Sequence, residues 1–281
     1  MDRAGSELTV PHVHQHPVLE AERLVRARFA AWNRADLSGL RAVLHVPHVS
    51  LPGHRLTIRE SEPDLLRGPD FRALASVESW HASALDDVDV RQSSPDKVHC
   101  VVRFGRNAAD GTRYANGQAV YVVTNHEGRW GIQVSSVTLR PIGVGGADDD
   151  DAVEAATSVL RRWVDARDGD DPLALRRLVH LPFVDVEGAR VHVRRSGTAL
   201  RRDVIQQTAA RQWRHSCVRQ VHVRERSAHK VTVEAEIARY EPGGSLLARH
   251  AALVVVTQLQ GRWALQVYSS FLMSSPELGR R

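Results

Sequence analysis

Cysteine is scarce in this sequence of 281 residues, since only Cys100 and Cys217 are present. Two cysteines cannot build the disulfide framework that stabilises many small secreted proteins. No apolar run reaches the ~18–20 residues that a helix needs to cross a bilayer. Residues 1–17 include early acidic residues and no apolar centre, so they do not have the pattern of a secretory signal. These absences favour a cytoplasmic protein without a membrane partner.

The sequence also lacks a large excess of one charge. The 38 Lys and Arg residues stand against 33 Asp and Glu residues, which gives a net charge of +5. Most of the basic residues are arginines interleaved with acidic residues, and dense pairs such as Arg194-Arg195 have no aromatic neighbours. Surfaces that bind single-stranded nucleic acid combine basic residues with aromatic stacking platforms. The pattern therefore predicts a solvated, Arg-rich surface and no nucleic-acid partner.

Motifs that bind cofactors or metals are absent as well. The sequence has no Gly-rich phosphate loop, no nucleophile elbow and no paired-cysteine zinc pattern. Alternating histidines occur at His12, His14 and His16, but no cysteine or carboxylate follows at ligand spacing. We therefore expect no metal site and no cofactor, and we expect a flexible N-terminal tail.

What the sequence does contain is a duplication. Residues 18–140 are repeated, diverged but in register, over residues 150–273. The segment Gly128-Arg-Trp-Gly-Ile-Gln-Val134, for example, matches Gly261-Arg-Trp-Ala-Leu-Gln-Val267. The predicted organisation is a tail (1–17), a first domain (18–142), a linker (143–151), a second domain (152–274) and a C-terminal tail (275–281).

Each copy begins with a helical pattern and continues with alternating strands. Apolar residues recur every three or four positions over residues 19–32, which predicts a helix. A short strand is predicted at 46–51, where Pro47 suggests a sheet edge or a strand start. A third helix is predicted at 64–77 and, in the second copy, at 201–210. Helices followed by a run of antiparallel strands indicate the α+β class.

Three segments of the first copy carry a resemblance to a known family. These are Ala31-Trp-Asn-Arg-Ala-Asp36, the strand at 45–51, and the closing hairpin with Val122-Val-Thr124 and Gly128-Arg-Trp130. In this order they resemble the nuclear-transport-factor-2-like superfamily, which includes SnoaL-like polyketide cyclases and ketosteroid isomerases. The resemblance implies two tandem cone-shaped domains, each with helices packed on a curved antiparallel sheet around an apolar pocket. It also implies pairing of the sheets as an intramolecular pseudo-dimer, and it leaves homo-oligomers open.

The same resemblance directs attention to one carboxylate. Ketosteroid isomerases use a tyrosine on the first helix and a carboxylate base just after the second helix. The tyrosine position holds Arg28 in the first copy and Val159 in the second, so that mechanism does not carry over. Near the base position, Asp185 of the second copy remains a candidate base or ligand-binding residue. The alternative is that Asp185 is a turn residue.

Histidines that occur in only one copy are the candidates for catalysis. His45 is matched by His180, which indicates a role in the fold. His48 and His81 are replaced in the second copy by Phe183 and Arg214. Imidazole has a pKa near 6.5 and transfers protons at neutral pH. We therefore predict His48 and His81 as a catalytic acid and base, with two surface histidines as the alternative.

The remaining candidates lie beside His81 and in the predicted strand that contains Val120 and Val122. Alternation places His81 and Ser83 on one face of a strand and Trp80 on the other, without deciding which face lines the pocket. Tyr121, which is Val254 in the second copy, could place a hydroxyl in the first pocket. We therefore predict Trp80, Ser83 and Tyr121, together with Asp185, as ligand-binding residues.

These observations lead to two hypotheses about function. The first is a SnoaL-like enzyme of the cyclase, lyase or isomerase type. It would act by proton transfer on a small apolar or aromatic molecule in the pocket of the first domain. The second is a non-catalytic ligand-binding or assembly module with the same tandem fold. The two differ in whether His48 and His81 meet at one enclosed cavity.

Overall fold

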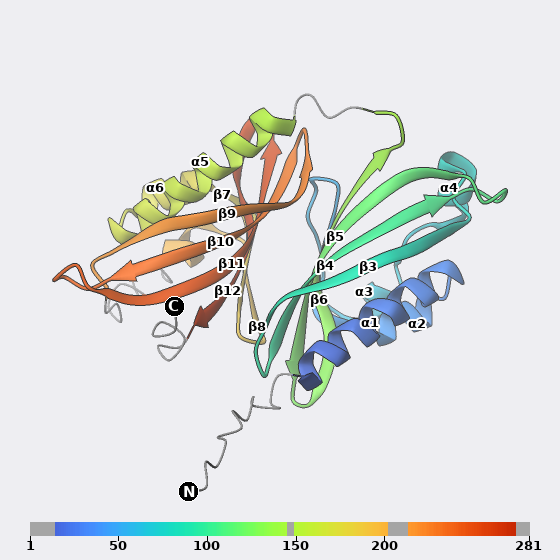
Figure 1. The fold of residues 1–281 in the computed structure, drawn as a ribbon, viewed down its shortest axis with the longest axis horizontal. Helices are drawn as coiled ribbons and strands as arrows, with labels where there is room; N and C mark the ends of the chain where they lie inside the picture. The colour runs from blue at the N-terminus through green and yellow to red at the C-terminus, as the bar shows by residue number, and fades with distance from the viewer. Residues whose placement is uncertain (1–14, 145–148, 202–212, 274–281) are drawn as a thin grey trace, which may run out of the picture.

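The computed structural model describes residues 15–144, 149–201 and 213–273, which form two α+β domains of similar construction (Figure 1). The first domain contains α1 (Gln15–Asn33), α2 (Leu37–Ala42), β1 (Leu44–Pro52), β2 (Thr57–Arg59), α3 (Glu62–Leu65), α4 (Phe71–Glu78), β3 (Ala82–Ser93), β4 (Lys97–Asn107), β5 (Arg113–His126) and β6 (Arg129–Pro141). The second contains α5 (Asp149–Asp168), α6 (Pro172–Leu178), β7 (Val179–Glu187), β8 (Arg190–Arg194), β9 (His215–Ser227), β10 (Lys230–Tyr240), β11 (Leu246–Leu259) and β12 (Arg262–Met273). No helix among these residues is long and apolar enough to span a membrane.

The helices differ in detail from the predicted ones. Helix α1 begins at Gln15, within the expected tail, and α5 begins at Asp149, within the expected linker. The helix expected at 64–77 is divided into α3 and α4, which are separate elements. The helix expected at 201–210 lies, apart from its first residue, outside the described residues, as do the tail residues 12–14.

The two sheets have the same topology. Their strand orders are β2-β1-β6-β5-β4-β3 and β8-β7-β12-β11-β10-β9. Strand β1 runs parallel to β6, and β7 runs parallel to β12, so each sheet is mixed and not antiparallel throughout as predicted. Of the two positions predicted for Pro47, the structure agrees with the strand start, because Pro47 is near the start of β1, whereas β1 lies between β2 and β6 and is not an edge strand. Pro47 falls where the β1–β6 register shifts, between Leu44 and Val49, so its missing N–H removes no ladder hydrogen bond.

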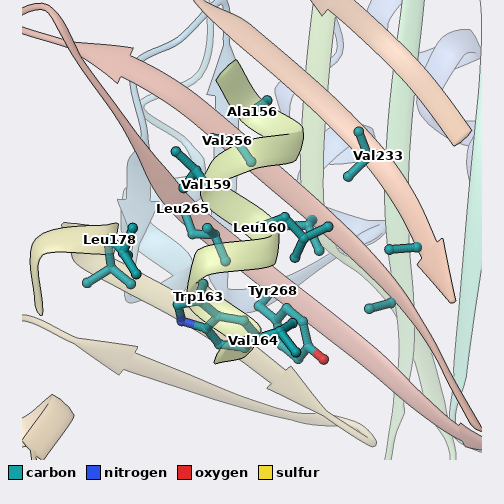
Figure 2. Packing of buried hydrophobic residues seen from close by; sticks show 14 of the residues in the cluster. Ala156, Val159, Leu160, Trp163, Val164, Leu178, Val233, Val256, Leu265 and Tyr268 are labelled. Carbon is teal, nitrogen blue, oxygen red and sulfur yellow. The ribbon is translucent and has the colours of Figure 1, made fainter. Parts of the chain in front are cut away.

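The helices cover one face of each sheet and build a core there (Figure 1). Helix α5 buries a stripe of residues spaced three or four apart, which includes Ala156, Leu160 and Trp163. Figure 2 shows this stripe against the second sheet, with the Trp163 ring 4.6 Å from the ring of Tyr268. The first domain has a corresponding cluster around Phe29, with Trp130 buried at its edge. Each domain therefore has its own hydrophobic core.

The opposite faces of the two sheets pack against each other through a third apolar cluster. Branched aliphatic residues dominate this cluster and come from both copies: Val49, Leu51, Val120, Val122, Val134, Val184, Val186, Leu253, Val255 and Val267. All of them are buried. The sheets therefore lie back to back, with the helices outside, as Figure 1 shows.

Two equivalent lysines cross this apolar contact in opposite directions. The ammonium Nζ of Lys97 in the first copy donates to the carbonyl oxygens of Val186 (2.9 Å) and Ser270 (2.7 Å). Lys230 in the second copy donates to the carbonyls of Leu51 (3.2 Å) and Val137 (2.7 Å). Burial lowers the pKa of Lys97 to about 8 and also lowers that of Lys230. Because a buried ammonium needs partners, each copy's lysine depends on the other copy's backbone.

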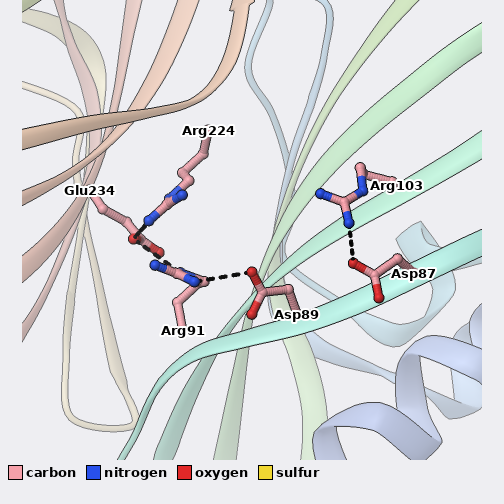
Figure 3. A network of polar contacts seen from close by, with 6 residues as sticks. All are labelled: Asp87, Asp89, Arg91, Arg103, Arg224 and Glu234. Atoms are coloured by element: carbon pink, nitrogen blue, oxygen red, sulfur yellow. Dashed lines mark hydrogen bonds and ion pairs between the residues drawn. The ribbon is translucent and has the colours of Figure 1, made fainter.

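Charged groups at the rim add a second link between the copies (Figure 3). The carboxylate of Glu234 accepts hydrogen bonds from Arg224 of its own copy, at 2.8 and 2.6 Å. It also accepts one from Arg91 of the first copy at 3.4 Å. Arg91 and Arg224 are equivalent positions of the duplication, so one carboxylate holds both. The Arg103–Asp87 pair, also in Figure 3, lies within the first copy and is exposed.

Buried histidines stabilise each domain from within. His45 and His180 are equivalent, and each places Nε2 3.1 Å from two backbone carbonyls of its own copy. This agrees with the structural role predicted for the pair. His48 is also buried, with Nδ1 3.1 Å from the carbonyl of Ile132 and Nε2 3.1 Å from the hydroxyl of Ser135. Burial lowers the pKa of His48 to about 3.

The lysine contacts predict a large loss of stability in Lys230→Met. This substitution keeps most of the side-chain volume, but it leaves the two carbonyls unpaired and removes the cation 3.9 Å from buried Glu225. We expect the free energy of unfolding, measured by urea denaturation, to fall by about 3–5 kcal/mol. The control Arg103→Met breaks an exposed ion pair, and its cost should stay below about 1 kcal/mol. Similar losses in the two variants would contradict a central role for Lys230.

The buried imidazole of His48 predicts a pH dependence of stability. The unfolded chain takes up a proton on this residue below a pKa near 6.5, whereas the folded protein does so only near pH 3. The free energy of unfolding should therefore fall as pH decreases from about 6.5, by about 2–3 kcal/mol at about pH 4.5 for this one residue. His48→Phe, which introduces the residue of the second copy, should remove that share of the pH dependence. Identical slopes in urea denaturation of the two proteins would contradict it.

Candidate functional site

A cavity of about 420 Å³ opens in the second domain, against the face of the sheet that the helices cover. Its lining is rich in ionisable and hydrogen-bonding side chains. Those of the second copy are Asp185, Tyr268, His250, Arg167 and Arg239, together with Glu187, Ser270 and Trp213. The second copy thus contributes most of the polar groups of the cavity.

Adjacent strands place two of these groups side by side. Asp185 on β7 and Tyr268 on β12 are Cα partners in the parallel pairing of these strands. Their side chains therefore leave the sheet on the same face. Burial raises the pKa of Asp185, although Arg194, whose Nη2 lies 3.6 Å from the carboxylate, opposes this effect. Burial also raises the pKa of Tyr268, so its hydroxyl stays protonated and can donate a hydrogen bond.

His250 on β11 brings an imidazole into the same cavity. The residue is only 3% exposed, and its Nε2 has no hydrogen-bond partner among the described residues. Burial, followed by the charges of Arg239 and Arg167, lowers its pKa to about 3. The ring is therefore neutral at physiological pH. A buried, unpaired ring nitrogen that lines a cavity is available for a ligand.

Two guanidinium groups bring positive charge into the cavity, whose lining also holds the carboxylates of Asp96, Asp185 and Glu187. The Arg239 guanidinium stacks 3.8 Å from the centre of the Trp213 ring, and that of Arg167 lies 4.7 Å from the Trp163 ring. Burial lowers the pKa of Arg239 to about 10, and the neighbouring charge of Arg167 lowers it further in the same direction. The two cations thus repel each other across a partly desolvated space. An anionic group of a ligand would relieve that repulsion.

The first domain closes one side of this cavity. Ser94 and Asp96 come from the turn between β3 and β4, and the Ser94 hydroxyl donates to the Asp96 carboxylate at 2.7 Å. Lys97, which follows directly, also lines the cavity and is fixed by the carbonyls of Val186 and Ser270. The cavity is therefore built from both copies.

The first copy lacks counterparts of Asp185, Tyr268 and His250, although Arg106 is its equivalent of Arg239. By the alignment of the copies, Ser50 and Ser135 occupy the places of Asp185 and Tyr268, and they are likewise Cα partners. Gly117 stands in place of His250, and a Cβ atom on it would approach the Phe104 ring to 2.2 Å. Phe104 therefore fills space that the His250 side chain uses in the second copy.

The structure separates the two histidines predicted to be catalytic. His48 is buried, with both ring nitrogens hydrogen-bonded inside the first domain. His81 is exposed at the start of β3. The two do not meet at one enclosed cavity, so the acid and base predicted for the first domain are not brought together.

The predicted ligand-binding residues also have different surroundings. Trp80 is buried and donates from Nε1 to the Ser83 hydroxyl at 3.1 Å, which shows that Trp80, and not His81, faces inward. Tyr121 lies in the first core, with the Arg28 guanidinium 5.3 Å from its ring. Of the four candidates, only Asp185 lines the cavity described above. Sequence reasoning missed Tyr268, His250, Arg167 and Arg239. Two of them, Tyr268 and His250, could have been found from the duplication, because the first copy has Ser135 and Gly117 at the equivalent positions.

No metal centre is found in the parts of the chain that the structure describes. Nowhere in them do three or more His, Cys, Asp or Glu side chains gather in a way that could hold an ion.

Comparison with known proteins finds similarity in fold. The sequence matches no protein-family model and no curated protein. Solved structures similar to it are NTF2-like, cystatin-like and ketosteroid isomerase-like proteins. A cystatin-like protein of unknown function from Nostoc punctiforme has 13% identity and a TM-score of 0.38, over 46% of this chain and 94% of its own.

Two further structures give the same picture. An NTF-2-like protein of unknown function from Shewanella oneidensis has 15% identity and a TM-score of 0.34, over 43% of this chain and 98% of its own. A ketosteroid isomerase-like protein from Erwinia carotovora has 19% identity and a TM-score of 0.35, over 46% of this chain and 99% of its own. Each of these three matches covers less than half of this chain.

Proposed function

We propose that the second domain binds a small organic anion that carries a carbonyl group, and that Asp185 transfers a proton on it. The observation that carries this proposal is the shared cavity of Asp185, Tyr268, His250, Arg167 and Arg239. This retains the proton-transfer chemistry expected from the sequence. It moves that chemistry from the first domain to the second, and it gives the ligand a charge.

The two arginines support an anionic ligand. A carboxylate placed between the guanidinium groups of Arg167 and Arg239 would accept charge-assisted hydrogen bonds and offset their mutual repulsion. The indole of Trp213 stacks on Arg239, which orients that guanidinium and leaves its edge for the ligand. Trp213 and Phe271 also line the cavity, so an aromatic or apolar body of the ligand has surfaces to pack against.

Asp185 and Tyr268 support the reaction. The Asp185 carboxylate would take a proton from the carbon next to the ligand carbonyl. The carbonyl oxygen would then gain negative charge, and the Tyr268 hydroxyl would stabilise that charge by donating a hydrogen bond. In a ligand with a β,γ double bond, return of the proton from Asp185 to the γ-carbon shifts that double bond to the α,β position and completes an isomerisation with no change in oxidation state. A pKa raised by burial strengthens a carboxylate as a base near neutral pH.

One contact favours a second candidate, a binding protein without catalysis. Arg194 is only 6% exposed, and it pairs with the carboxylate of Asp185 at 3.6 Å. A base engaged in a buried ion pair is less available to a substrate. In this case Asp185 would orient Arg194, and the cavity would bind its ligand unchanged.

The contact between the copies supports a further part of the proposal. We propose that the two domains act as an intramolecular pseudo-dimer, in which the first domain serves as a scaffold for the second. Asp96 and Lys97 of the first domain line the cavity, so the site depends on the pairing of the sheets.

Binding can be tested with benzoate, a small aromatic carboxylate, by isothermal titration calorimetry. We expect one benzoate per chain, and we expect Arg239→Gln to weaken binding by about 10- to 100-fold because a charged hydrogen-bond donor is lost. Arg249→Gln is the matched control, since Arg249 lies on the same sheet but pairs with Glu236 outside the cavity. Equal effects of both variants, or no saturable binding, would count against the anion site.

Proton transfer can be tested with phenylpyruvate in D2O, by following exchange of its α-protons by NMR. We expect the protein to accelerate exchange and Asp185→Asn to reduce that acceleration by at least about 100-fold, within the range of general base catalysis. Tyr268→Phe should reduce it less and leave benzoate affinity nearly unchanged. If Asp185→Asn exchanges as fast as the unaltered protein, Asp185 is not the base. Binding without any exchange would favour the non-catalytic alternative.

A further inference from the structure

A second hollow, of about 750 Å³, lies between the two copies and away from the cavity of the second domain. On one side it is lined by the turn that joins β1 to β2, which contributes His54 and Arg55. On the other side it is lined by α6, the start of β7 and the β11–β12 turn, which contribute Arg176, His180 and Arg262. We call this hollow the interdomain groove.

The groove collects positive charge without an acidic counterpart. None of the residues that line it is Asp or Glu. Among the described residues, neither Arg55 nor Arg176 has a carboxylate oxygen within 4.0 Å. Arg262 donates to the backbone carbonyls of Arg177 and Val179, and its pKa is lowered by burial and then by the charge of Arg176. Arg176 and Arg262 therefore lie close enough to repel each other, and no carboxylate in the lining offsets their charge.

The duplication shows that two acidic residues of the first copy are absent from the equivalent positions at the groove. In the first copy, the equivalent of Arg176 is Arg41, whose Nη2 lies 3.0 Å from the Glu62 carboxylate. The second copy has Gly197 in place of Glu62, and a Cβ atom there would lie 3.4 Å from Cδ of Arg176. The turn before β12 likewise has Gln260 where the turn before β6 has Glu127. Two acidic positions of the first copy are thus neutral in the second, while the arginines remain.

The shape and the side chains favour a small ligand over a nucleic acid. The lining contains no Trp, Tyr or Phe on which bases could stack. The cations come from opposite walls and surround a bounded space, whereas a nucleic-acid surface extends as a stripe of basic residues. Guanidinium groups bind phosphate oxygens with two parallel hydrogen bonds, and side-chain amides such as Gln258 add neutral donors.

We propose that the interdomain groove binds a small molecule bearing a phosphate or pyrophosphate group, held between Arg55 of the first copy and Arg176 and Arg262 of the second. This site is separate from the cavity of the second domain and does not rest on the proton-transfer proposal. Because its walls come from both copies, a bound anion would also stabilise the contact between them.

The test is calorimetric titration of the full chain with inorganic pyrophosphate at low ionic strength. We expect saturable binding of one pyrophosphate per chain that weakens as salt is added. Arg176→Gln and Arg55→Gln should each weaken it at least about tenfold, a loss typical of one charge-assisted contact. The matched control Arg41→Gln, at the equivalent position of the first copy, should change the affinity less than twofold. Thermal unfolding of each variant verifies that it is folded.

Three outcomes would overturn the proposal. They are the absence of saturable pyrophosphate binding, an equal loss in Arg41→Gln, and tighter binding of a single-stranded oligonucleotide that the same two variants abolish. The last outcome would assign the groove to nucleic acid. Arg239→Gln should leave pyrophosphate binding unchanged, so failure at the cavity of the second domain and failure at the groove can be told apart.

Discussion

The reciprocal burial of two lysines, each hydrogen-bonded to the backbone of the opposite sheet, is the constraint on which the rest of the structure depends. Lys97 and Lys230 each place an ammonium group among the backbone carbonyls of the opposite copy, inside an apolar contact. An ammonium group buried without those carbonyls would be costly in free energy, so separating the two sheets is strongly unfavourable. The same contact positions the β3–β4 turn at the cavity and the β1–β2 turn at the interdomain groove.

Within this shared frame the two copies have diverged in opposite directions. In the first copy the interior is filled by Phe104 and by His48. Both ring nitrogens of His48 are hydrogen-bonded, one to the Ile132 carbonyl and the other to the Ser135 hydroxyl. The second copy holds Asp185, Tyr268 and His250 around a cavity. The duplication therefore separates two tasks: the first domain supplies packing and part of a wall, and the second supplies the chemical groups.

The sequence was sufficient for the α+β class, the duplication and the structural role of His45 and His180, because these depend on local periodicity and on matched positions. It could not show that β1 pairs with β6 in parallel, since that pairing brings together residues far apart in the chain. Lys97 and Lys230 could not be predicted either, because their carbonyl partners lie 89 and 179 residues away. His48 and His81 were chosen because only the first copy has them. The same comparison in the other direction points to Asp185, Tyr268 and His250, which only the second copy has.

Native-state hydrogen exchange tests most directly whether the two copies form one cooperative unit. The amides of β6 and β12, at the centre of the contact, should exchange through a single global opening, with equal free energies that fall together as denaturant is added. This is expected because opening either copy removes the carbonyl partners of the buried lysine in the other copy. Exchange of β6 at a distinctly lower free energy than β12, or the reverse, would contradict it.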